Sequence, residues 1–107
     1  MNIENTKAQM RKGILELCIL AILSKQESYP SEIILLLKKN ELIVVEGTLY
    51  PLLTRLKNED LLTYRWQEST EGPPRKYYAL TEEGERFLAE LKTTWDNLSN
   101  AVNNSLN

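Results

Sequence analysis

The last quarter of the chain carries a helix-pairing pattern that a domain of this size cannot bury on its own. Thr81 is a residue type that caps helices, and the acidic residues after it suit the positive end of a helix dipole. Apolar residues then repeat at alternating spacings of three and four: Leu88, Leu91, Trp95, Leu98 and Val102. A helix over residues 82–106 is roughly 37 Å long at about 1.5 Å per residue. The pattern therefore predicts a helix that projects from the domain and pairs with a second subunit.

Three shorter helices are predicted in the first 58 residues. Residues 5–24 carry two neighbouring apolar stripes, so this helix needs two partners, which we expect to be the domain core and a second chain. Pro30 suits the first turn of a second helix that ends near Asn40. In the third helix, apolar residues at i, i+3, i+4 and i+7 direct one face into the core: Leu49, Leu52, Leu53 and Leu56.

The start of the third helix is unusual because "VEGTLYPLLTRL", residues 45–56, contains a glycine and a proline. If Thr48 is the N-cap, Pro51 lies at the third helical position, where its missing amide hydrogen would be unpaired anyway. If the helix begins near Glu46, Pro51 should kink it. Val45 has no capping side chain, which favours the later start at Thr48. In both cases Gly47 removes side-chain bulk, so that backbone amides can approach an anion such as phosphate.

A β-hairpin is predicted between the third helix and the last one. Residues 62–67 alternate between two faces, "STEGPP" is a turn cluster, and residues 75–80 form a second strand rich in aromatic residues. The order helix, helix, helix, hairpin, long helix indicates a mainly α fold with a β-hairpin wing, a winged helix-turn-helix. We expect residues 1–80 to form the DNA-binding domain, with its first helix contributing to a dimer, and residues 81–107 to form a C-terminal dimerisation helix.

Several classes of protein are excluded by composition. The chain has no histidine and one cysteine, Cys18, which rules out a disulfide framework, the usual zinc sites and a Ser-His or Cys-His nucleophile. Glu82, Glu83 and Glu85 are explained by the helix dipole without catalysis. The longest apolar run, residues 14–23, is shorter than the roughly 20 residues that span a bilayer. We therefore expect no enzyme, no cofactor, no metal site and no membrane segment, and a cytoplasmic location with Cys18 in a packing role.

Two polar clusters are candidates for contact with nucleic acid. The outer side of the third helix carries hydroxyl, amide and guanidinium groups, and "RKYY" on the second strand places Arg75 and Lys76 beside two tyrosines. Each cluster taken alone is also typical of an ordinary solvated surface. The net charge is −2, but residues 81–107 hold five acids and two bases, which leaves the rest of the chain at +1. Glu68 and Glu71, at the tip of the predicted hairpin, do not favour phosphate binding.

The segments "EGTLYPLLTRLKNEDLL" and "GPPRKYYALTEEGE" resemble the PadR family of bacterial transcriptional regulators, and the resemblance extends from about Arg11 to Val102. It implies a homodimeric winged-helix repressor that binds a palindromic operator in double-stranded DNA and releases it when a small molecule binds. By that likeness "GTLYPLLTRL" is the recognition helix and "GPPRKYY" is the wing. The implied DNA contacts are Thr48 and Tyr50 to phosphates, Thr54 and Arg55 to bases or backbone, and Arg75 and Lys76 from the wing.

The resemblance also indicates an effector site. In relatives that bind several drugs, a tryptophan at the position of Trp95 lines a pore at the dimer centre and stacks flat aromatic compounds. Met10, Leu15 and Leu98 are the apolar companions that we expect there. The simpler interpretation is that Trp95 only fills the helix-pairing seam. An alternative function is a winged-helix protein-interaction module without sequence-specific DNA binding, which the net negative charge and the acids of the wing tip favour.

Overall fold

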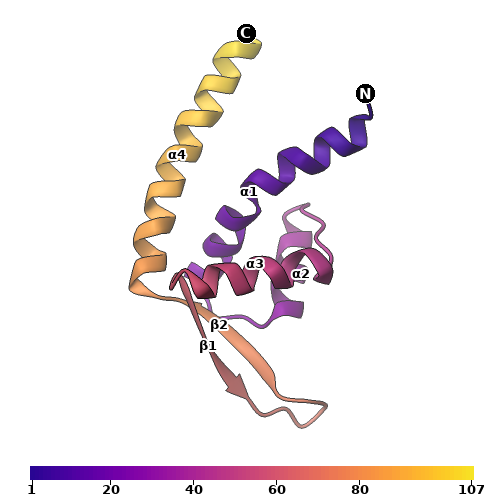
Figure 1. The fold of residues 1–107 in the computed structure, drawn as a ribbon, viewed down its shortest axis with the longest axis vertical. Coiled ribbons are helices and arrows are strands. Elements are labelled where there is room, and N and C mark those ends of the chain that lie inside the picture. Colours follow the sequence, from indigo (N-terminus) through magenta and orange to yellow (C-terminus); the bar gives the residue numbers. More distant parts are fainter.

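The computed structural model describes residues 1–107 and contains four helices and one two-stranded antiparallel sheet (Figure 1). The order matches the winged helix-turn-helix prediction. Three helices precede the sheet, and the fourth projects from the same end of the body as the N-terminal part of the first, the two helices diverging toward their free ends. The elements are α1 (Ile3–Lys25), α2 (Pro30–Lys39), α3 (Glu46–Asn58), β1 (Leu62–Gln67), β2 (Arg75–Leu80) and α4 (Glu82–Leu106).

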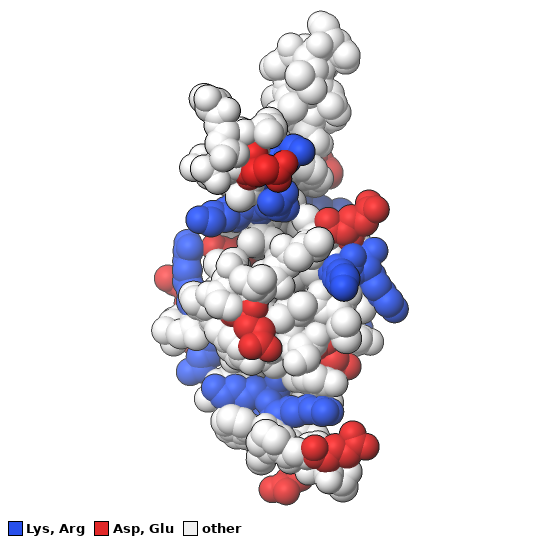
Figure 2. All heavy atoms as spheres, turned by 90° about the vertical axis from the view of Figure 1, so that its right-hand side faces the viewer, with Lys and Arg blue, Asp and Glu red and all other residues white.

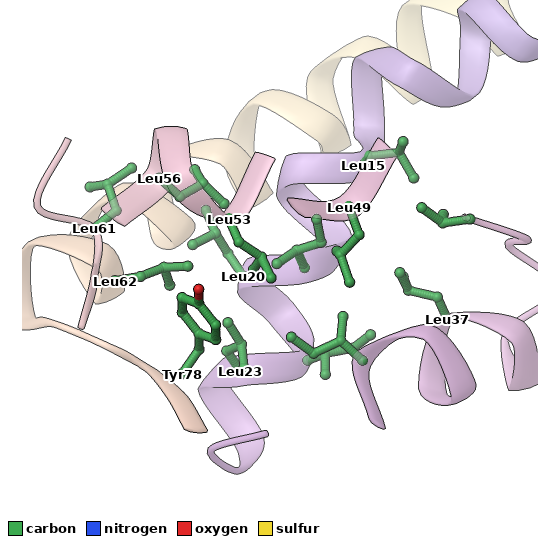
Figure 3. Close-up of a cluster of buried hydrophobic side chains, with 14 residues drawn as sticks. Leu15, Leu20, Leu23, Leu37, Leu49, Leu53, Leu56, Leu61, Leu62 and Tyr78 are labelled. Atoms are coloured by element: carbon green, nitrogen blue, oxygen red, sulfur yellow. The ribbon is translucent and has the colours of Figure 1, made fainter. Parts of the chain in front are cut away.

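The core lies where α1, α2, α3 and the base of the hairpin meet (Figure 3). It is a cluster of 14 buried residues, mostly leucine and isoleucine, and Tyr78 from β2 closes one end of it. Full burial of one such side chain contributes about 1.5–3 kcal/mol. In α4 only Gly84 is fully buried, and Leu88 and Leu91 are partly buried against the core, so most of the buried surface comes from the first three helices and the hairpin.

The predicted start of α3 at Thr48 is wrong. The helix begins at Glu46, with Val45 as an N-cap residue that makes no side-chain hydrogen bond, and the amides of Thr48 and Leu49 both donate to the Val45 carbonyl at 3.0 Å. Pro51 therefore lies inside the helix. A proline there costs about 3 kcal/mol. The burial of Leu49, Leu53 and Leu56 on the inner face offsets this cost, since each contributes about 1.5–3 kcal/mol.

The hairpin prediction is confirmed. β1 pairs with β2 in a register that places Tyr64 opposite Tyr78 and Trp66 opposite Lys76. The connection between α1 and α2 joins the hairpin through Ser28, whose amide donates to the Tyr78 carbonyl at 3.0 Å and whose carbonyl accepts from the Tyr78 amide at 2.9 Å. Ser28 is buried, and this bridge attaches β2 of the wing to the body.

The start of α4 is held close to the turn between α3 and β1. The Thr81 hydroxyl caps the helix by accepting from the Gly84 amide at 3.0 Å, and it donates to the Asp60 carbonyl at 2.6 Å. A Cβ atom on Gly84 would lie 2.2 Å from the Leu61 carbonyl oxygen, so only glycine permits this close approach.

Beyond this turn α4 leaves the body, as predicted from the length of the pattern. Leu88 and Leu91 pack against the core, whereas Leu98 and Val102 are each more than half exposed. The C-terminal half of the predicted seam is therefore free in the single chain. None of the helices is both long and apolar enough to cross a lipid bilayer.

Candidate nucleic-acid interface

An open cleft of about 610 Å³ lies between the start of α2, the outer face of α3 and the wing. Hydroxyl, aromatic and cationic side chains from these elements line it. They include Tyr29, Tyr50, Thr54, Trp66, Arg75 and Lys76. Because the cleft joins a helix face to a hairpin, it has the two parts with which winged-helix proteins contact a groove and its flanking backbone.

The outer face of α3 contributes Tyr50 and Thr54. The two residues are one helical turn apart, so they share one side of the helix, while Leu49 and Leu53 face the core (Figure 3). Tyr50 is 46% exposed and Thr54 is exposed. Thr48 is half-buried in the first turn and does not line the cleft.

Arg55 points toward α1. Its Nη1 lies 3.0 Å from Oε1 of Glu16, and the Arg55 side chain is two-thirds exposed. An exposed ion pair of this kind contributes about 0–1 kcal/mol. The pair is therefore weak enough for a DNA phosphate to compete with Glu16 for the guanidinium group.

Arg75 and Lys76 both border the cleft, but their side chains leave β2 on opposite faces of the hairpin, because successive strand residues alternate. The Arg75 guanidinium lies 4.4 Å from the centre of the Tyr29 ring. The Lys76 ammonium lies 4.5 Å from the Tyr64 ring centre and 5.2 Å from that of Trp66. Aromatic rings therefore restrict both cations in the free protein.

Tyr29 and Trp66 are two residues of this surface that the sequence analysis did not identify as contacts. Trp66 is 61% exposed because it lies beyond the edge of the core, near the end of β1. An aromatic residue at the end of a strand, opposite "RK" in the next strand, was a signal that could have found it. Tyr29 gave no such signal, since only the fold brings it to Arg75.

The distribution of charge is uneven along the long axis of the molecule. Figure 2 shows Lys and Arg side chains across the lower part, acidic groups at the lowest end and no charged residue at the top. The lowest end is the wing tip, which carries Glu68 and Glu71, and the top includes the last part of α4, which has no charged residue after Asp96. The cations of the wing therefore lie between the body and an acidic tip.

A separate apolar groove of about 210 Å³ lies between α1 and α4. Trp95 and Leu98 line it together with Ile14, Leu17, Phe87 and Leu91. Met10 and Leu15, which we expected beside Trp95, do not. Leu15 lies in the core with 4% of its surface exposed, because it belongs to the inner stripe of α1, and Met10 is exposed outside the groove.

Cys18 is half-buried on α1 and packs against the core, in the packing role expected for it. Burial raises the pKa of the Cys18 thiol above its ordinary value. The protonated form therefore dominates at neutral pH, and the thiol is a poor nucleophile.

Comparisons with known proteins agree on one family. Residues 19–90 match the model of the transcriptional regulator PadR-like family. A PadR-like transcription factor from Bacteroides fragilis is 64% identical, with 92% of this chain and 96% of that chain covered and a TM-score of 0.78. A PadR-like transcriptional regulator from Bacillus cereus is 44% identical, with coverages of 92% and 96% and a TM-score of 0.80.

Two further relatives extend this picture. A PadR family transcriptional regulator from Eggerthella lenta is 31% identical and has a TM-score of 0.89, with 97% of this chain and 91% of that chain covered. An uncharacterised protein from Lysinibacillus sphaericus is 28% identical over 92 residues, which cover 83% of this chain and 84% of the relative. The similarity therefore includes the helices, the wing and most of α4.

Proposed function

The chain belongs to the PadR-like family of transcriptional regulators, which bind DNA and are not enzymes, and we propose that it is a homodimeric, ligand-responsive repressor. The observation that carries the DNA-binding part is the cleft that unites the outer face of α3 with Arg75 and Lys76 of the wing. In this proposal residues 1–80 are the DNA-binding domain and residues 81–107 the dimerisation helix. The protein then works in the cytoplasm, where its DNA lies.

In the proposed complex α3 enters the major groove of the operator and the wing lies on the flanking backbone. Thr48 and Tyr50 anchor phosphates, and Thr54 and Arg55 contact bases or backbone. From the wing, Arg75 and Lys76 supply the charge that neutralises phosphates. The exposure of Tyr50 and Thr54, next to the cationic side chains of the wing, supports this arrangement.

The free seam of α4 supports the homodimer. Leu98 and Val102 are 55% and 54% exposed, and they follow the spacing of a helix-pairing seam in a segment without charge. In the dimer, α4 packs against α1 and α4 of the second subunit. Two copies of α3 then meet two half-sites of a palindrome, about 34 Å or a multiple of it apart.

We propose that the effector is a small, flat aromatic compound held near the dimer centre. Trp95 is 44% exposed at the groove between α1 and α4, and its ring can stack on such a compound. Leu98 and Phe87 supply apolar contacts on the same groove. Binding there changes the packing of α1 against α4 and releases the operator.

The experiment is a gel-shift titration of the purified protein against the DNA upstream of its own gene, at two salt concentrations, with unrelated DNA as the control. We expect tight binding that prefers the upstream fragment and weakens steeply with salt, because each neutralised phosphate releases counterions. Equal and weak binding to both fragments would contradict binding to that operator and favour the protein-interaction alternative.

A further inference from the structure

A row of charged and aromatic side chains ties the wing to the connection between α1 and α2. The row is Glu27, Arg65, Tyr77, Tyr29 and Arg75, and we call it the wing ladder. Nε of Arg65 donates to both carboxylate oxygens of Glu27, at 3.1 and 3.2 Å. This charge-assisted contact lowers the pKa of Glu27. The ladder therefore begins with a paired carboxylate on the body and a guanidinium on β1.

Each further step of the wing ladder is a stacked or edge contact. The Arg65 guanidinium lies 4.9 Å from the Tyr77 ring centre, and the Tyr77 and Tyr29 rings meet edge to face with centres 5.2 Å apart. Arg75 then covers the other end of the row, 4.4 Å from the Tyr29 ring centre. Residues of the α1–α2 connection and residues of the hairpin thus interlock along the row.

The backbone of Tyr29 is held in place because Tyr29 is the N-cap residue of α2. Its amide donates to Oε1 of Glu32 at 3.2 Å, and its carbonyl accepts from the Ile33 amide at 3.1 Å. Arg75, in contrast, belongs to the last pair of the hairpin before the loop, opposite Gln67. A long side chain at such a place loses rotamer freedom when it binds a phosphate, at about 0.5–1.5 kcal/mol.

We propose that Arg65 and Tyr77 are positioning residues for DNA binding, which hold the Arg75 guanidinium beside α2 before DNA arrives. The inference rests on the proposed function and goes beyond it, because neither residue lines the cleft or contacts DNA in the proposed complex. The ladder holds Tyr77 edge to face against Tyr29, and Arg75 lies on the Tyr29 ring. The Arg75 side chain has then lost part of its rotamer freedom in the free protein, before it binds DNA.

Lys76 provides an internal contrast. Its aromatic neighbours, Tyr64 and Trp66, are residues of the hairpin itself and lie on the face opposite the wing ladder. Lys76 therefore does not depend on the α1–α2 connection for its place. Substitutions that break the wing ladder should weaken DNA binding through Arg75 and leave the contribution of Lys76 unchanged.

The test is a double-mutant cycle on operator affinity. Tyr77→Leu breaks the ladder in the middle and is expected to weaken operator binding about 2- to 12-fold, the equivalent of ordering one long side chain. Tyr77→Phe keeps the ring and should stay within about twofold of the wild type. In an Arg75→Ala background Tyr77→Leu should have no further effect, whereas in a Lys76→Ala background it should keep its full effect.

A second comparison uses two exposed ion pairs. Glu27→Gln weakens the ladder, and Glu83→Gln is the matched control, because Glu83 pairs with Arg86 on α4, outside the cleft. We expect only Glu27→Gln to lower operator affinity, with both variants folded by circular dichroism. If Tyr77→Leu weakens operator binding by the same factor in the wild-type and Arg75→Ala backgrounds, Tyr77 does not act through Arg75. The positioning role is then overturned, although the protein still binds its operator. A wild type that binds no operator would overturn the proposed function as well.

Discussion

The Arg55 guanidinium on α3 lies 3.0 Å from the Glu16 carboxylate on α1, so an ion pair joins α3 to the helix that borders the apolar groove. Glu16 itself lines that groove, beside Ile14 and Leu17. The same carboxylate therefore borders the proposed effector site and holds a proposed DNA contact. A movement of α1 that separates Glu16 from Arg55 would free the guanidinium group to reach a phosphate.

Glu16→Gln should raise operator affinity about two- to fivefold, because it removes a carboxylate that competes with phosphate for Arg55. The ion pair is exposed, so the free energy of unfolding should fall by less than about 1 kcal/mol. Gel-shift titration and thermal unfolding measure the two quantities. Glu4→Gln is the control, since Glu4 pairs with Lys7 on the same helix, far from α3 in the sequence. An operator affinity that falls or does not change would remove Arg55 from the DNA contacts.

Arg75→Ala should weaken binding to every DNA sequence and flatten the dependence of affinity on salt. One phosphate contact fewer reduces the slope of log affinity against log salt concentration by about 0.9. Titrations at four or more salt concentrations give the slope, and Arg86→Ala on α4 is the control for the loss of one exposed arginine. If the slope for Arg75→Ala equals that of the wild type, Arg75 makes no phosphate contact.

Gly84→Ala should destabilise the domain by about 1–3 kcal/mol, the usual penalty for adding a methyl group where there is no room. The new Cβ would lie 2.2 Å from the Leu61 carbonyl oxygen, which is backbone and cannot rotate away. Gly47→Ala is the matched control, because a Cβ there meets nothing within 4 Å. Thermal unfolding should show a lower midpoint for Gly84→Ala alone. Equal midpoints for the two variants would mean that α4 can shift away from Leu61 without loss.

Leu98→Asp should convert the proposed dimer to a monomer. It places one unpaired charge from each subunit in the apolar seam, and a penalty of a few kcal/mol weakens the dimer by a factor of about 100 or more. Sedimentation velocity at micromolar protein concentration measures the change, and operator affinity should fall with it. Asn100→Asp is the control, because it adds the same charge on the opposite side of α4. If Leu98→Asp and Asn100→Asp are both monomeric, or both dimeric, Leu98 has no specific role in the dimer contact.

The sequence predicted the elements whose signals are local. Thr81 and the spacing of the last helix gave its start and extent, and the alternation in residues 62–67 indicated the first strand. The start of α3 was missed because it depends on the backbone and not on a capping side chain. The Val45 carbonyl accepts from the amides of Thr48 and Leu49, so the helix begins at Glu46 without a side-chain cap.

The candidate site was predicted in its parts and missed in its arrangement. Arg75 and Lys76 were found as a pair, although strand alternation already implied that they face opposite sides. The contact of Arg75 with Tyr29 could not be predicted, because it depends on the backbone bridge between Ser28 and Tyr78, which joins distant segments. Leu15 was expected at the effector pocket but lies in the core, since two neighbouring apolar stripes do not reveal which one faces the core.

The contacts of Thr81 and Gly84 at the start of α4 have a consequence for the design of chimaeric regulators. The hydroxyl and the missing side chain at these two positions fit the α4 start to the backbone of Asp60 and Leu61. An exchange of α4 between relatives should therefore begin after Gly84 and keep both residues from the recipient. A graft that replaces them also replaces the contacts that set the direction of α4, and with it the distance between the two DNA-binding domains of the proposed dimer.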